Sequence, residues 1–80
     1  MTKKKLIEDI VQSPSRFHRA PLDVIRDRRF NDEERLEILT AWEREIRRQD
    51  GDEESHRMRL VSDAREEVAR RARPEGEQGA

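Results

Sequence analysis

The stretch from Phe30 to Gly51, FNDEERLEILTAWEREIRRQDG, decides the fold of this chain. Asn31 is a favoured N-cap residue, and Glu34 follows three positions later, as in a capping box. Gly51 fits the position just past a helix, where a left-handed residue closes the last turn. Between these ends, apolar side chains recur every three or four positions and form one stripe: Leu36, Ile38, Leu39, Trp42 and Ile46. The stretch therefore predicts a well-capped amphipathic helix.

A second long helix is expected over residues 53–73, where Pro74 would stop it. Its stripe is thinner and rich in alanine and valine, and consists of Met58, Leu60, Val61, Ala64, Val68 and Ala72. Ser55 is expected either to cap this helix a turn late or to lie in its first turn. The short turn at residues 50–52 makes the two long helices antiparallel neighbours, which predicts a helical hairpin.

Two shorter helices are expected before the hairpin. Residues 3–12 carry a narrow apolar stripe of Leu6, Ile7, Ile10 and Val11. Pro14 interrupts this pattern, because the residue before a proline avoids the helical region. The following residues, 13–20, look like a basic linker. Pro21 suits the first position of another short helix, which is expected to end near residues 27–29.

The expected fold is all-α: an antiparallel helical hairpin with one or two short N-terminal helices in a small bundle. We divide the chain into a short amphipathic helix and basic linker (1–19), a helical domain (20–73) and a disordered tail (74–80). The expected core consists of Leu22, Val24, Ile25, Phe30, Leu36, Leu39, Trp42, Ile46, Leu60, Val61, Ala64 and Val68.

The composition points toward self-association. The 80 residues are 46% charged and 31% hydrophobic, so the apolar side chains are few for a stable core. The chain has no cysteine, so no disulfide can compensate. Completion of the bundle by a homodimer is therefore an open expectation. The absence of cysteine also fits a reducing compartment, and we take a cytoplasmic location as the default.

The leading functional hypothesis is a small non-enzymatic interaction or regulatory module with an unknown protein partner. It would act by docking a helix face made of Leu39, Trp42, Ile46, Val61 and Val68. Tryptophan is enriched at binding hot spots. However, the spacing of Trp42 from Leu39 and Ile46 also matches a core face, so both interpretations stay open.

The alternative hypothesis is a nucleic-acid accessory protein that uses the arginine-rich segment 16–29. Its candidate residues are Arg16, Phe17, Arg19, Arg28 and Arg29. Phe17 would stack on bases while the arginines hold phosphates. The whole chain has a net charge of −1, which argues against a strong general attraction to nucleic acid but leaves a local patch open.

No catalytic, cofactor-binding or metal site is expected. His18 and His56 have no second histidine or cysteine at ligand spacing. The chain has only three glycines, and they do not form a phosphate-binding loop. No apolar run approaches the ~20 residues of a membrane span, so no membrane association is expected.

The residues from Pro21 to Arg47 resemble a family of small, uncharacterised helical proteins of proteobacteria. Shared features are a proline-initiated short helix and a following helix with the pattern R-x-x-I-L-x-x-W, here Arg35 to Trp42. The resemblance covers residues 20–48 and departs at residues 52–58. It implies the same helical fold and transfers no function.

Overall fold

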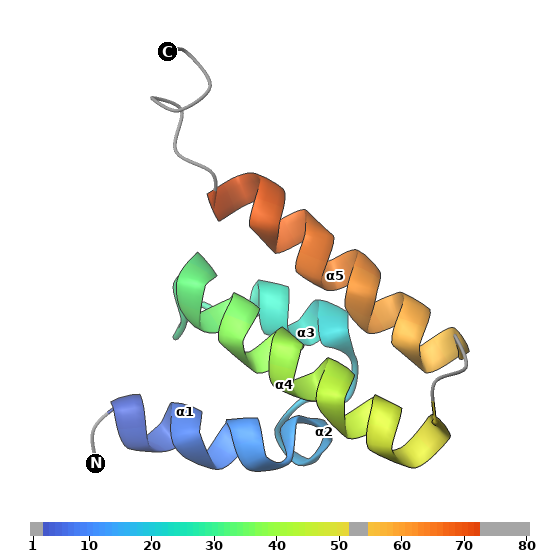
Figure 1. The fold of residues 1–80 in the computed structure, drawn as a ribbon. Helices are drawn as coiled ribbons and strands as arrows, with labels where there is room; N and C mark the ends of the chain where they lie inside the picture. Colours follow the sequence, from blue (N-terminus) through green and yellow to red (C-terminus); the bar gives the residue numbers. More distant parts are fainter. Residues whose placement is uncertain (1–2, 52–54, 73–80) are drawn as a thin grey trace.

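The structure is a computed structural model that describes residues 3–51 and 55–72, and these residues form an all-α bundle. In chain order the helices are α1 (Lys3–Gln12), α2 (Pro14–Phe17), α3 (Pro21–Arg26), α4 (Asp32–Asp50) and α5 (His56–Ala72). Helices α4 and α5 form the long antiparallel pair, with α1 on the other side of α4 (Figure 1). The predicted fold class is therefore confirmed.

Local hydrogen bonds fix both ends of α4. The Glu34 backbone N–H donates to Asn31 Oδ1 at 2.8 Å, and the Asn31 backbone N–H donates to Glu34 Oε1 at 2.8 Å. Gly51 has a φ of 78°, and its N–H donates to the Arg47 carbonyl at 2.9 Å. The predicted capping box and glycine stop are both confirmed. Glu34 also pairs with Lys3 at 2.9 Å, which ties the start of α1 to the start of α4.

Replacing Asn31 with alanine is expected to lower the free energy of unfolding by about 1 kcal/mol, because one N–H at the start of α4 loses its acceptor. Chemical denaturation followed by circular dichroism measures this change. Asn31→Asp is the matched control, since it keeps an acceptor and places a negative charge where the helix dipole favours it. Equal losses in the two variants would contradict a capping role.

Two of the connections between helices carry a residue that starts the next helix. The Ser55 hydroxyl accepts from the Met58 N–H at 3.1 Å, so Ser55 caps α5 as expected. The linker prediction for residues 13–20 is wrong in part, because Pro14–Phe17 form the single turn α2. Pro14 ends one helix and also starts the next, since its fixed φ suits a first helical position. The expected disordered tail, 74–80, lies outside the described residues.

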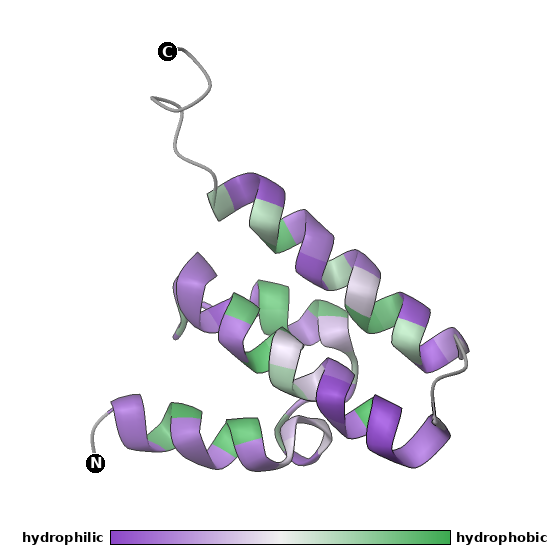
Figure 2. Cartoon of the chain, viewed as in Figure 1, coloured by the Kyte–Doolittle hydropathy of each residue, from purple (hydrophilic) through white to green (hydrophobic). Residues whose placement is uncertain are grey.

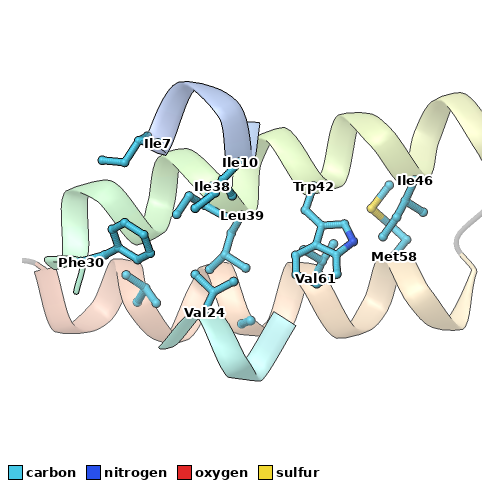
Figure 3. Close-up of a cluster of buried hydrophobic side chains, with 12 residues drawn as sticks. Ile7, Ile10, Val24, Phe30, Ile38, Leu39, Trp42, Ile46, Met58 and Val61 are labelled. Atoms are coloured by element: carbon cyan, nitrogen blue, oxygen red, sulfur yellow. The ribbon is translucent and has the colours of Figure 1, made fainter. Parts of the chain in front are cut away.

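The core lies on both sides of α4, which among the described helices is the only one that contacts all of the others. Figure 3 shows Ile7 and Ile10 of α1 on one side and Val61 and Met58 of α5 on the other. The apolar side of α1 faces α4 in Figure 2. The buried cluster consists of Ile7, Ile10, Val24, Phe30, Ile38, Leu39, Trp42, Ile46, Met58, Val61, Ala64 and Val68.

The core prediction is wrong for two residues, Leu22 and Leu60, which lie on the surface. Leu22 is 51% exposed and Leu60 is 44% exposed. Leu60 is adjacent to Val61, and neighbouring helix positions point about 100° apart, so both cannot face α4. Two further predicted core residues, Ile25 and Leu36, are only half-buried against the cluster.

Candidate interaction groove

The exposed leucines lie along a groove between α3 and α5. Its volume is about 610 Å³, and it is lined by Ala20, Pro21, Leu22, Ile25, Leu60, Asp63, Ala64, Glu67 and Arg71. Pro21 and Ala64 are buried, whereas Leu22 and Leu60 stand half-exposed. Large half-exposed side chains around buried small ones form an apolar trough, and such grooves are typical places for a ligand or partner to bind.

The sequence of α5 explains why the groove exists. Val61 and Val68 point into the core and are fully buried, so they fix the face that α5 turns to α4. Ala64 has a single methyl group, and this leaves space between α5 and the short helix α3. The six residues of α3 contribute only Leu22 and Ile25 to the groove beyond its proline. The space is therefore left open.

Charged side chains border the groove on α5. Asp63, Glu67 and Arg71 follow one another at intervals of four residues and so share one side of the helix. Glu67 pairs with Arg70 at 2.6 Å. Asp63 is exposed and, within residues 3–51 and 55–72, has no ion-pair partner. Among the described residues, the border thus offers a carboxylate without an ion-pair partner next to apolar surface.

A smaller hollow of about 170 Å³ adjoins the groove and shares Ala20, Pro21 and Leu60 with it. Trp42 and Ile46 reach its wall, although they are only 5% and 1% exposed. The two hollows together run along the side of the bundle where α3 crosses α5.

The five residues predicted to form an interaction face lie in the interior of the chain. Leu39, Trp42, Ile46, Val61 and Val68 are each at most 5% exposed. Trp42 packs between α4 and α5 beside Val61 in Figure 3, so within this chain it is a core residue. A partner that docks on the folded chain must contact other residues. The adjacent positions of Leu60 and Val61 are the sequence signal that one of them faces outward.

The candidate residues of the arginine-rich segment border different hollows and connections of the bundle. Arg16 and Phe17 border a hollow with Asp9, while Arg19 borders the hollow beside Trp42. Arg28 and Arg29 follow α3, in the connection that meets the preceding one through the bond between His18 and Asp27. Phe17 is 47% exposed and does not plug the core.

Arg29 already forms an ion pair and a ring contact within the chain. Its guanidinium donates to Asp27 Oδ2 at 2.7 Å and lies 5.2 Å from the centre of the Phe30 ring. One of the candidate nucleic-acid residues therefore has part of its charge neutralised within the chain.

Asp27 joins the two connections that flank α3. The buried His18 donates from Nε2 to Asp27 Oδ2 at 3.0 Å. The bonds from Arg29, with a further contribution from His18, hold the pKa of Asp27 well below its usual range. Arg35 donates to the Asp27 carbonyl at 3.0 Å. This cluster was not anticipated, because its members are brought together only by the reversal of the chain around α3.

The histidine of this pair is packed in the interior of the bundle. His18 Nδ1 is buried and has no hydrogen-bond partner among the residues that the structure describes. The His18 ring lies edge-on to Phe30, with 6.5 Å between the ring centres. A general base must reach the proton that it removes, and in this conformation the free nitrogen of His18 is sealed from solvent.

Among the described residues, neither a cluster of metal-ligating side chains nor a membrane-spanning helix is found. Within residues 3–51 and 55–72 there is no group of three or more histidine, cysteine or acidic side chains that could hold a metal. None of the described helices combines the length and apolar character needed to cross a membrane.

Comparison of the chain with protein-family models, with curated proteins and with solved structures finds no match. The resemblance to the proteobacterial helical proteins stays a prediction.

Proposed function

We propose that this protein is a non-enzymatic interaction module that binds a helix of a partner protein in the groove between α3 and α5. The observation that supports the proposal is the pairing of Leu22 and Leu60, two large exposed apolar side chains on different helices that border one trough. Single exposed leucines are common on protein surfaces. Two leucines around a shared groove form a contiguous apolar surface, which is typical of an interaction site.

The backbone of the groove favours a helix as the ligand. Both walls are helices, so their N–H and carbonyl groups are already paired along their own axes. An extended peptide would find no sheet edge there and would leave its own backbone groups unpaired against apolar surface. A helix satisfies its backbone internally and presents a stripe of apolar side chains, as in other helix-in-groove complexes.

Site-specific photo-crosslinking tests the proposal. A photoreactive phenylalanine derivative is placed at position 22 or 60 of the full chain, which is then irradiated in extract of the native cells. Phe17 is the matched control position, because it is an exposed apolar residue of similar exposure that lies outside the groove. We expect protein adducts at positions 22 and 60 and none at 17. Adducts at no position, or equally at all three, would contradict the proposal.

A further inference from the structure

Trp42 has a hydrogen-bond donor for which the described part of the chain supplies no acceptor. The residue is only 5% exposed, and the N–H of a buried tryptophan usually finds a partner. Within residues 3–51 and 55–72, however, this indole N–H forms no hydrogen bond. It is also not one of the two unpaired side-chain atoms that are sealed from solvent there, His18 Nδ1 and Arg35 Nε. The ring lines the hollow of about 170 Å³, which is therefore the open space beside this donor.

The other polar side chains of the hollow can also donate. They are Ser15, Arg19 and Arg57, and none of the described side chains that line the hollow is acidic. Arg57 pairs with Asp50 at 2.6 Å. Arg19 is exposed and has no ion-pair partner in the described ranges. Glu45 of α4 is buried and does not line the hollow. A lining of donors without an acid favours an anionic acceptor.

The hollow continues the groove at one end. On α5 the groove begins at Leu60, and the hollow extends from Leu60 to Arg57, about one turn toward the start of the helix. Both share Ala20 and Pro21 on the opposite wall. The hollow of about 170 Å³ is smaller than the ~300–1,000 Å³ of ligand pockets, so its size suits one side chain better than a whole ligand.

Resting on the function proposed above, we infer that the partner helix carries an aspartate or glutamate about one turn beyond its apolar anchors, and that this carboxylate enters the hollow. It accepts from the indole N–H of Trp42 and pairs with Arg19. The rest of the indole stays in the core, and only its nitrogen is used. A partner with an apolar side chain at this place would leave the N–H without water and without an acceptor, which costs affinity. The hollow thus selects among helices that fit Leu22 and Leu60.

Stapled helical peptides of ~14 residues, a length at which an unstapled helix is marginal in water, test the inference on the full chain. All carry the same leucine stripe. One turn beyond the stripe, one peptide has glutamate and its partner peptide has the neutral isostere glutamine. Such a pair is made for each end of the stripe, because a helix can lie in the groove in either direction.

The chain itself provides separate signals for the hollow and for the groove. Trp42 is the only tryptophan, so its indole N–H gives a single proton resonance that reports on the hollow. Amide chemical shifts of Leu22 and Leu60 report on the groove. Fluorescence anisotropy of labelled peptides gives the dissociation constants.

We expect the glutamate peptide of one pair to shift the indole and groove resonances together. It should bind about tenfold more tightly than its glutamine partner, as suits hydrogen bonds to a charged group. Arg19→Gln should reduce this preference several-fold. Arg16→Gln is the matched control, since it removes the same charge from an exposed arginine that borders a different hollow. It should leave the preference in place.

The contrary outcomes are distinct. Equal binding of glutamate and glutamine peptides at the groove, or equal effects of Arg19→Gln and Arg16→Gln, overturns the carboxylate while the groove remains a helix-binding site. If sodium acetate shifts the indole resonance as strongly as the glutamate peptide at equal concentration, the hollow takes a free small anion and the inference fails. A dimer that sedimentation detects and Arg19→Gln dissociates overturns it in favour of a second copy. If no peptide shifts the groove amides and position 60 forms no adduct, the proposed function itself fails.

Discussion

Replacing Trp42 with alanine is expected to lower the free energy of unfolding by about 3–5 kcal/mol. The indole is 5% exposed and packs in the cluster that joins α4 to α5. Its removal takes away apolar burial and leaves a cavity between the two long helices. At ~0.05–0.15 kcal/mol per residue, a chain of 80 residues has a total stability of about 4–12 kcal/mol, so the variant should lose a large part of its stability.

Denaturation followed by far-ultraviolet circular dichroism measures this effect, because the variant has lost the only tryptophan and with it the fluorescence signal. Phe17→Ala is the control, since it also truncates an aromatic side chain, but one that is 47% exposed. It should cost less than about 1 kcal/mol. If the two variants lose equal stability, Trp42 does not have the core position described above.

Replacing Asp27 with alanine is expected to cost about 2 kcal/mol, the size usual for a lost charged hydrogen bond that strands its partner. His18 Nε2 would then be a buried donor without an acceptor, and Arg29 would lose the carboxylate that holds it. Equilibrium unfolding at neutral pH measures the loss. Glu66→Ala, which removes an exposed carboxylate elsewhere, should have little effect.

The same carboxylate makes stability depend on pH in a definite direction. The folded state lowers the pKa of Asp27 below its ordinary value of about 4, so the folded state binds the proton less readily than the unfolded chain. The stabilisation is therefore present above about pH 4 and is lost as the pH falls further. Glu34 and Asp50 also have lowered pKa values and add to the same slope.

Asp27→Asn isolates the contribution of this residue, because asparagine has a similar shape and does not titrate. The difference in unfolding free energy between the wild type and Asp27→Asn should shrink as the pH is lowered from 6 to 3. A difference that stays constant over this range would show that the carboxylate is not selectively ionised in the folded state.

The sequence predicts well the features that depend on near neighbours. The Asn31–Glu34 box and the Gly51 stop follow from residues at most four positions apart, and the structure has both. The antiparallel hairpin follows from the shortness of the turn after α4. These features depend on backbone geometry within one or two turns, which local residue type controls directly.

The features that sequence reasoning missed depend on contacts between distant segments. Whether Leu60 or Val61 turns inward depends on how α5 is rotated against α4, and the six residues of α3 leave Leu60 44% exposed. The burial of Ile10 requires α1 to dock on α4. The pairing of His18 with Asp27 crosses the whole of α3. The stripe that contains Ile10 indicates that α1 is amphipathic but does not say which helix it packs against, and the other two features leave no periodic pattern in the sequence.

The central position of α4 has a consequence for the order of folding. α4 and α5 are neighbours in the chain and share the most extensive contact in the bundle. Closing the short loop between them costs little chain entropy and brings most of the core together. Such a local arrangement is typical of rapidly folding helical proteins. We expect the hairpin to form first and the N-terminal helices to add afterwards. α1 should add last, since among the described helices it packs only on α4 and α2.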